Sequence, residues 1–343
     1  MRHFQFSILI SLACLAVAGF WGYTHGGVTA AATALGITLI LAVLEISLSF
    51  DNAVVNASIL KNWDAYWQSL FLTLGIVLAV FGMRLLFPLL IVAQTADLGM
   101  PEVVRLALHN PKEFSNHLSA NHAEVAAFGG VFLLLVFLNF LLDEKKEQHW
   151  LGHIEEKLAL FGKIGSVPVL IALAVVLSSI TLVGAAQQLA VLLAGVWGII
   201  TYVGVDFVSS LLEKEEITGI NLGDAVKRGG IGGFLYLEVL DASFSFDGVI
   251  GAFAITNDVV LIMLGLAIGA LFVRAMTVYL VRQGTLEKYV YLEHGAHYAI
   301  GILALIMFAS IKYHIPEIFT GLIGVIFIFA SLWSSIKHQA ARS

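Results

Sequence analysis

The sequence predicts an all-α polytopic membrane protein with about ten transmembrane helices and two inverted three-helix repeats. Of its 343 residues, 59% are hydrophobic and only 12% are charged, whereas about a quarter of a soluble chain is charged. The mean hydropathy of +0.93 indicates the same class. The repeats are indicated by a motif in residues 44–56, LEISLSFDNAVVN, which returns in residues 240–252 as LDASFSFDGVIGA.

The composition also excludes several classes of function. The net charge is −6 and the basic residues are spread through the connections, so the chain offers no patch for nucleic acid. The single cysteine, Cys14, excludes an intramolecular disulfide and any paired-cysteine metal or redox motif. No nucleophile lies beside a base, and the glycine-rich residues 229–233 only precede a span. We therefore expect neither an enzyme nor a bound cofactor.

Apolar runs define the spans. Residues 4–23 form either a retained first span, which we favour, or a signal-like segment, because Ala16-Val-Ala18 resembles a cleavage site. Residues 28–60 are too long for one straight helix, since about 20 residues cross a bilayer core. We expect this run to be broken or strongly tilted. The other spans are residues 67–92, 123–142, 167–182, 187–211, 231–256, 259–281, 295–311 and 315–336.

The basic residues orient these spans. With a cytoplasmic N-terminus, the inner side holds Arg2, Lys61, Lys145, Lys146, Lys157, Lys163, Lys214, Lys227, Arg228, Arg282, Lys288, Lys337 and Arg342. The outer side then holds Arg105, Lys112 and Lys312. Such an excess follows the positive-inside rule. It predicts a multi-pass protein in the lipid bilayer of the cell inner (plasma) membrane, with both termini cytoplasmic.

The two motif runs are five spans apart, so they cross the membrane in opposite directions, as in an inverted repeat. Arg84 and Arg274 lie in the spans that follow, and His122 and His294 precede the third spans on opposite sides of the membrane. The predicted parts are an N-terminal span or signal-like segment (1–27), repeat one (28–142), a cytoplasmic loop (143–166), two extra spans and a loop (167–230), repeat two (231–312), and a last span with a cytoplasmic tail (313–343). We expect the polar connections 94–122 and 143–165 to be solvated.

The motif runs carry the predicted site. A carboxylate costs about 2.5–3.5 kcal/mol at the centre of a span, and like charges in a low dielectric repel unless protons or a cation neutralise them. We expect both motif helices to be unwound, near Asp51 and near Asp247, so that their carboxylates can share one ion. Hard oxygen ligands suit magnesium, calcium and manganese. The predicted metal ligands are Glu45, Asp51, Asn52, Glu238, Asp241 and Asp247.

Other roles for these polar residues stay open. Arg84 and Arg274 are deep enough in their spans to be charge partners of carboxylates. The carboxylates could also form polar helix contacts that only hold the fold together. His122 and His294 could extend the ligand set toward zinc or iron, although their position at a helix entry favours an interfacial role.

The motifs also resemble a known family. Residues 241–258, DASFSFDGVIGAFAITND, with Arg274 and the YLEHG run at 291–295, are similar to the second half of the TerC-type integral membrane proteins. Residues 45–52, EISLSFDN, are similar to the first motif of that family. The resemblance covers residues 36–312. It departs at residues 248–249, where the family has Ser-Ile, in the histidine-bearing outer loop and in spans five and six. The resemblance implies manganese export or a part in tellurium resistance, and a place among LysE-like exporters.

Together these observations predict an exporter of divalent cations, with manganese as the leading ion and protons as counter-ions, working through a midplane carboxylate site between the repeats. One alternative is a non-transporting membrane subunit of a tellurium- or stress-resistance assembly, whose connections would bind membrane or peripheral protein partners. Another is a LysE-like exporter of basic amino acids, which also needs an acidic site.

Overall fold

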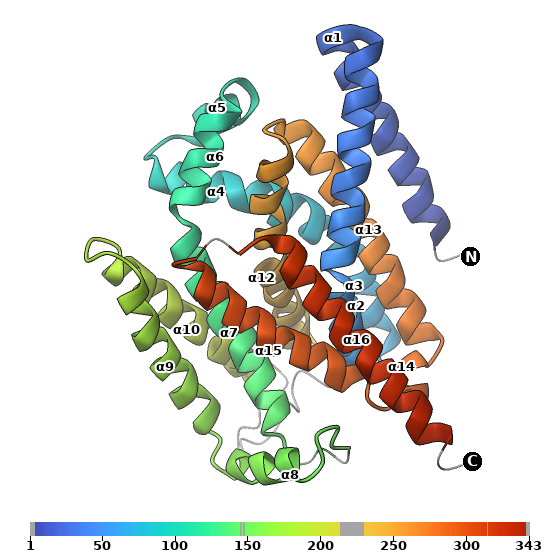
Figure 1. The fold of residues 1–343 in the computed structure, drawn as a ribbon, viewed down its shortest axis with the longest axis vertical. Coiled ribbons are helices and arrows are strands. Elements are labelled where there is room, and N and C mark those ends of the chain that lie inside the picture. The colour runs from blue at the N-terminus through green and yellow to red at the C-terminus, as the bar shows by residue number, and fades with distance from the viewer. Residues whose placement is uncertain (1–3, 145, 147, 213–229, 314, 341–343) are drawn as a thin grey trace.

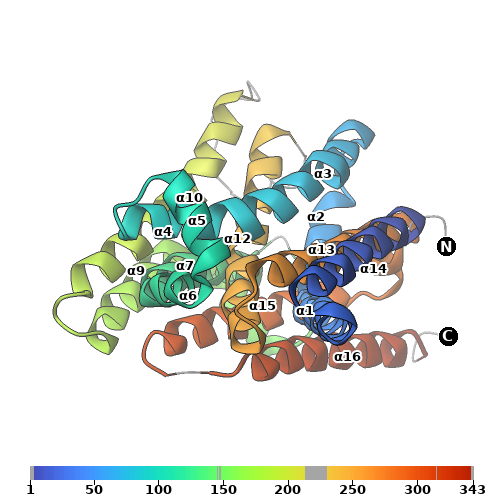
Figure 2. The same cartoon turned by 90° about the horizontal axis from the view of Figure 1, so that it is seen from above.

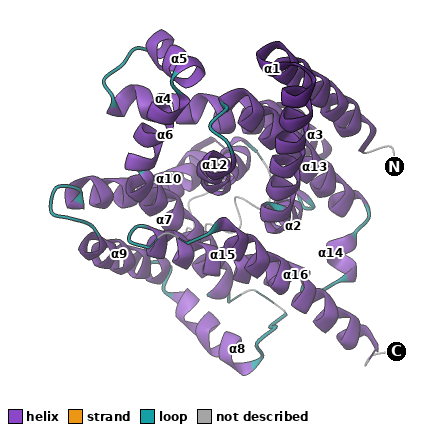
Figure 3. Ribbon diagram, turned by 45° about the horizontal axis from the view of Figure 1, so that its top comes forward, coloured by secondary structure: helices purple, strands orange, loops and turns teal. Residues whose placement is uncertain are grey.

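The chain is helical throughout the part that the structure describes. The computed structural model describes residues 4–144, 146, 148–212, 230–313 and 315–340, and these ranges contain no strand (Figure 3). The helices are α1 (Gln5–Leu48), α2 (Phe50–Leu60), α3 (Ala65–Val77), a π-helix (Leu78–Leu86), α4 (Phe87–Thr95), α5 (Met100–His109), α6 (Pro111–Ala120), α7 (His122–Leu141), α8 (His153–Ala159), α9 (Val167–Ser179), α10 (Gln188–Leu212), α12 (Ile231–Ile255), α13 (Val259–Arg282), α14 (Thr285–Lys288), α15 (Leu292–Ser310) and α16 (Glu317–Ala340). The all-α prediction is confirmed.

Seven helices in these ranges are long and apolar enough to cross a membrane, so the chain is a multi-pass membrane protein. They are Gln5–Leu48, Ala65–Gln94, His122–Leu141, Gln188–Val205, Val259–Arg282, Leu292–Ser310 and Phe319–Ala340. Short 3-10 helices, Leu160–Lys163 and Ile180–Leu182, follow α8 and α9. With these extensions the two helices form a bent pair, His153–Gly162 and Val167–Leu182, which would add an eighth span if it were one span. The count of about ten stays a prediction, because it also needs α1 to cross twice and the carboxylate-bearing α12 to cross once. The loop predicted within residues 167–230 falls on residues 213–229, outside the described ranges.

α1 is a helical hairpin. Its backbone leaves helical geometry at Gly26 and Gly27, and Gly27 has a φ of 68°, which favours glycine. A Cβ atom at Gly22 would lie 2.7 Å from Cβ of Ala34, so the two legs pack in close contact. Figure 1 shows the hairpin at the edge of the molecule, alongside α13. The first two predicted runs are therefore the two legs of one hairpin, and the second leg leads into α2.

α7 and α15 pack antiparallel at the centre of the molecule (Figures 1 and 2). The ring of Phe140, near the end of α7, lies 5.1 Å from that of His294 at the start of α15. At the other end, Ile311 packs against the cluster that contains Ala123. His122 and His294 therefore lie at opposite ends of this helix pair, as the inverted topology requires.

The two motif helices also run in opposite directions. A Cβ at Gly233, near the start of α12, would lie 2.7 Å from Cζ2 of Trp63, just beyond α2. A Cβ at Gly248, later in α12, would lie 2.8 Å from Oε2 of Glu45, earlier in the first motif. The two motif helices are therefore antiparallel. This crossing is what the predicted inverted repeat requires.

Connections predicted on the cytoplasmic side meet at one end of the molecule. Lys61 Nζ, after α2, lies 3.1 Å from Glu293 Oε2 in the first turn of α15. His294 Nε2, in the same turn, lies 2.8 Å from the carbonyl oxygen of Gln148 in the 143–166 connection. Three connections that the basic residues assign to one side therefore contact one another.

The connection 94–122 is not a plain solvated loop, so that expectation is wrong. It contains α5 and α6, and each begins with a proline in its first turn, where a fixed φ favours helix. Val103, Phe114 and Leu118 are buried in a hydrophobic cluster with residues of α12 and α13. The ring centroids of Phe114 and Phe253 are 5.9 Å apart. The hairpin α5–α6 therefore packs on the end of the second motif helix.

Candidate cation site

The first motif is broken, as the length of its apolar run predicts. α1 ends at Leu48 and α2 begins at Phe50, and Ser49 between them has φ −103° and ψ 16°. Ser49 Oγ donates a hydrogen bond of 3.0 Å to Oε1 of Glu45, whose residue is only 2% exposed. The break therefore places a hydroxyl beside a buried carboxylate.

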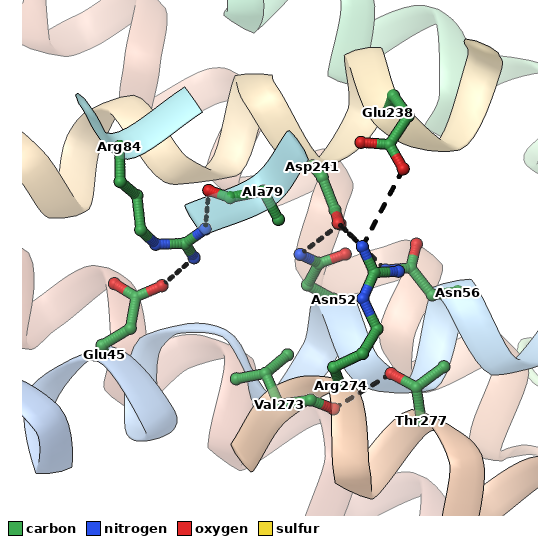
Figure 4. Close-up of polar contacts among 10 residues, drawn as sticks. All are labelled: Glu45, Asn52, Asn56, Ala79, Arg84, Glu238, Asp241, Val273, Arg274 and Thr277. Carbon is green, nitrogen blue, oxygen red and sulfur yellow. Dashed lines mark hydrogen bonds and ion pairs between the residues drawn. The ribbon is translucent and has the colours of Figure 1, made fainter. Parts of the chain in front are cut away.

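Arg84 neutralises that carboxylate. Its Nη2 donates to Glu45 Oε1, and its Nη1 donates to the carbonyl oxygen of Ala79 at 2.8 Å (Figure 4). Both charged side chains are buried, so the attraction acts outside bulk water. Arg84 belongs to the π-helix Leu78–Leu86, and π-turns frequently occur at functional sites. The sequence predicted the charge partner, but no residue pattern predicted the π-helix.

A small cavity lies beside Glu45 at the break. Its volume is about 30 Å³, and a water molecule needs about 10–15 Å³ by the same kind of measure. The lining residues are Glu45, Leu48, Ser49, Phe244, Gly248, Leu303 and Thr320. The cavity can therefore hold one or two water molecules or one dehydrated cation next to a carboxylate and two hydroxyl groups. Thr320 lies in α16, outside both predicted repeats, and the motif comparison did not identify it.

The second motif is not broken, so the predicted interruption near Asp247 is wrong. α12 runs without a break from Ile231 to Ile255. Ser243 Oγ donates to the carbonyl oxygen of Val239 at 2.9 Å, so this serine is satisfied inside the helix. A helix of 25 residues also fits one bilayer crossing, so its length does not require a break.

Asp241 is held by three donors. Its Oδ1 accepts hydrogen bonds from the side-chain amides of Asn52 and Asn56, both at 2.9 Å. Its Oδ2 accepts from Nη2 of Arg274 at 3.0 Å. Figure 4 shows this group apart from the Glu45–Arg84 pair. Two helices other than α12 thus fix the Asp241 carboxylate, and the prediction that both arginines pair with carboxylates is confirmed.

Glu238 shares Arg274 with Asp241. Its Oε1 lies 3.9 Å from Arg274 Nη2, and neither Glu238 oxygen accepts a hydrogen bond within the described ranges. The guanidinium carbon of Arg274 lies 3.7 Å from the centre of the Phe71 ring. One buried arginine therefore serves two buried carboxylates, and the ring of Phe71 covers its face.

The structure does not bring the predicted metal ligands together as one site. Among the described side chains, no group of three or more His, Cys, Asp or Glu residues could hold a metal ion. The ligands divide into Glu45 at the cavity and the group of Asn52, Glu238 and Asp241. Asp51 is buried against α16, where a Cβ at Gly324 would lie 3.3 Å from its Oδ2. The side chain of Asp247 is outside the described set.

The fold and the site define a class: an all-helical multi-pass membrane protein with two buried carboxylate–arginine groups, one beside a cavity at a helix break. The chain belongs to a family described as "Protein of unknown function (DUF475)", whose model matches residues 50–342. No curated protein matches the chain, and no solved structure does. The match spans α2 to α16, including both arginines and the second motif, and it begins just after Glu45 and Ser49.

Proposed function

We propose that this protein exports divalent cations, with manganese as the leading ion, across the cell inner membrane with both termini in the cytoplasm. The observation that carries the proposal is the cavity at Ser49. Its polar lining consists of the Glu45 carboxylate and the Ser49 and Thr320 hydroxyls. Oxygen ligands suit magnesium, calcium and manganese, and the resemblance to TerC-type proteins favours manganese. The ion is cargo that passes through the site.

Arg84 serves as an internal counter-ion in this mechanism. A buried carboxylate without a cationic partner is strongly destabilising, and Arg84 supplies that partner to Glu45. A cation that enters the cavity competes with Arg84 for the same oxygen atoms. When the cation leaves, Arg84 or a proton neutralises Glu45 again. The site can thus release its cargo without leaving a bare charge in the membrane.

The second group, around Asp241, serves as the anchor between the repeats. Its three hydrogen bonds come from α2 and α13, so Asp241 joins the two motifs through side chains of both repeats. In inverted-repeat transporters, access alternates as one repeat moves against the other around the binding site. We assign exchange of the ion to Glu45 and mechanical attachment to Asp241.

The test is transport by the purified protein in sealed liposomes that contain a manganese-sensitive dye. Glu45→Gln removes the charge with little change in shape, so we expect it to abolish manganese transport. Because it also leaves Arg84 unpaired, transport is compared at equal amounts of folded, inserted protein. Glu156→Gln is the matched control, because Glu156 is an exposed acid in α8, far from the motifs in the sequence. It should transport at the wild-type rate.

Arg84→Gln separates the counter-ion mechanism from simple ion binding. Without Arg84 the carboxylate has no competing partner. We expect less folded protein, and in the folded protein we expect manganese to bind more tightly and to be released more slowly. Both KM and kcat should fall. Arg84→Lys keeps the charge and should restore part of the turnover.

The same liposomes test the alternatives. Lysine or arginine movement without manganese movement would identify an amino-acid exporter. Movement of none of these ions or amino acids by folded, correctly inserted protein would contradict the transport proposal and favour the non-transporting subunit.

A further inference from the structure

The 143–166 connection ends in a short helical segment that turns sharply into the next helix. The helices His153–Gly162 and Val167–Leu182 meet at 95°. The second of these is strongly apolar and has the length of most of a bilayer crossing. If it runs along the membrane normal, the first lies in the plane of the membrane. Figure 1 shows α8 lying across the end of the molecule below α9.

This segment has one buried face, and its exposed surface is rich in large apolar side chains, with His153, Glu156 and Lys157 as exposed polar residues. Glu155 and Ala159 are buried against the protein. Large apolar side chains point outward in the same segment: Leu151, Ile154, Leu160, Phe161 and Ile164 are between 49% and 65% exposed. A solvated loop would not be expected to expose so many large apolar side chains in one short stretch.

We propose that residues 151–164 form an interfacial helix that places these apolar side chains in the boundary between the headgroups and acyl chains of the membrane that the other helices cross. Helices of this kind lie in the membrane plane with an apolar face in that boundary. The exposed apolar surface continues directly into that of α9, where Leu170 and Leu177 are also exposed. α9 is apolar enough to contact the bilayer, so we take the bilayer as the occupant of this surface as well.

Apolar contact rather than headgroup charge holds the segment at the membrane. Residues 151–164 contain two acidic residues, Glu155 and Glu156, and two basic ones, Lys157 and Lys163, so the segment has no net charge to attract anionic lipids. This interfacial role does not depend on transport by the protein. It differs from the docking of a protein partner, which the polar composition of residues 143–165 suggested.

The buried face ties this surface helix to the transmembrane core. Glu155 pairs with Lys146, and its Oε2 accepts from the backbone N–H of Leu151 at 3.1 Å. His294 Nε2, in the first turn of α15, lies 3.5 Å from Glu155 Oε1. Glu155 therefore connects the interfacial segment to the first turn of α15.

The experiment places a polarity-sensitive fluorophore on single cysteines in full-length protein, with Cys14→Ser as the background, in nanodiscs of phosphatidylcholine and phosphatidylglycerol. The probe sites are Ile154→Cys and Phe161→Cys, with Glu156→Cys as the control on the same helix. Ile164→Cys replaces either probe variant that does not fold. We expect blue-shifted emission and strong quenching by nitroxide-labelled lipids at the probe sites. Aqueous iodide should quench the control several times more strongly than the probes.

Two results would overturn the proposal. Equal iodide quenching at residues 154, 156 and 161 would show that the segment faces water. Protection of residues 154 and 161 in native membrane vesicles, but exposure of both in nanodiscs, would show that a protein partner covers the surface.

Discussion

Asn52 Nδ2 lies 2.9 Å from Asp241 Oδ1, so the amide of the first motif is bonded to the carboxylate of the second. In the repeat alignment Asn52 corresponds to Gly248, and Glu45 corresponds to Asp241. The reciprocal contact is also present, because a Cβ at Gly248 would lie 2.8 Å from Glu45 Oε2. The two motifs therefore contact each other through equivalent positions.

The difference between Asn52 and Gly248 accounts for the cavity. In the second group an amide fills the position next to Asp241 and donates to it. In the first group the equivalent position is glycine, which has no side chain, and Gly248 lines the cavity beside Glu45. One residue difference between the two motifs thus separates a carboxylate with three donors from one that has space next to it.

We expect Asp241→Asn to destabilise the protein by about 3 kcal/mol, the lower end of the range for a broken buried ion pair. In this variant Glu238, at 3.9 Å, is the remaining carboxylate beside Arg274. The new side-chain amide at position 241 also lies next to the amides of Asn52 and Asn56, which donated to the carboxylate. Thermal melting of the detergent-solubilised protein measures the change. Glu238→Gln should have a smaller effect, since Glu238 accepts no hydrogen bond in the described ranges. An equal loss in both variants would contradict the anchor role of Asp241.

Substitutions of Asp258 test how the α1 hairpin is attached to the start of α13. Its Oδ1 accepts from the backbone N–H groups of Val260 and Leu261 at the start of α13, and its Oδ2 accepts from Trp21 Nε1 at 2.9 Å. We expect Asp258→Ala to cost about 1 kcal/mol for the lost helix cap and about 1 kcal/mol for the lost hydrogen bond. Asp258→Asn keeps one accepting oxygen for the helix cap but presents its amide NH2 to the Trp21 Nε1–H, so it should lose only the Trp21 hydrogen bond, about 1 kcal/mol. A large loss in Asp258→Asn would show that the charge, and not the cap, is required.

We expect acid to release the 143–166 segment, because protonation of Glu155 weakens the contacts that hold it. Burial raises the pKa of Glu155, but the hydrogen bonds from Lys146 and Leu151 and the charge of Lys146 outweigh it and hold the pKa below its ordinary value of 4.5. A carboxyl whose pKa is lower in the docked state binds fewer protons there than after release. Docking is therefore favoured above pH 4.5 and weakens as the pH falls through the lowered pKa.

A nitroxide on Glu156→Cys, in the Cys14→Ser background, measures this release by electron paramagnetic resonance. We expect constant, restricted mobility from pH 8 to about pH 5 and increasing mobility below about pH 4.5. Adding Glu155→Gln removes the titrating group, so this variant should be more mobile than the wild type above about pH 4.5, as mobile as the wild type in acid, and show no acid transition. An unchanged acid transition in Glu155→Gln would assign the release to another group.

The lengths of the apolar runs predicted the helical part of the fold well. The 28–60 run had to break because it is longer than a bilayer crossing, and it breaks at Ser49. The serine-rich pattern by itself was misleading, because Ser243 bonds within an intact helix. The apolar run that contains the second motif has the length of one bilayer crossing. Only the run length therefore distinguished the broken first motif from the intact second one.

The site was predicted only in part, because a motif does not show which side chains face each other. The arginines were correctly paired with carboxylates, since a buried guanidinium needs a partner. The repulsion argument left open which cation would neutralise the acids, and the structure shows arginine at Glu45 and at Asp241. Thr320 was missed because it comes from α16, which lies outside both predicted repeats.

The difference between the two groups can be reversed with one substitution, Gly248→Asn. The new amide would occupy the cavity and donate to Glu45, as Asn52 donates to Asp241. A Cβ at position 248 meets only the carboxylate end of Glu45, at 2.8 Å, and that flexible side chain can shift. We expect a folded protein with a melting temperature close to that of the wild type and no manganese transport in liposomes, because the cargo loses both its space and its carboxylate.

Gly248→Ala is the matched control, because it adds a Cβ in the same place without the amide. It should keep part of the transport activity, since a methyl group fills less of the cavity and cannot donate to Glu45. The reverse change, Asn52→Gly, should lower the melting temperature, because it removes one of the three donors to Asp241 and adds glycine to α2. Full manganese transport by folded Gly248→Asn would show that the ion does not pass through this cavity, and Glu45 would then be a second structural anchor.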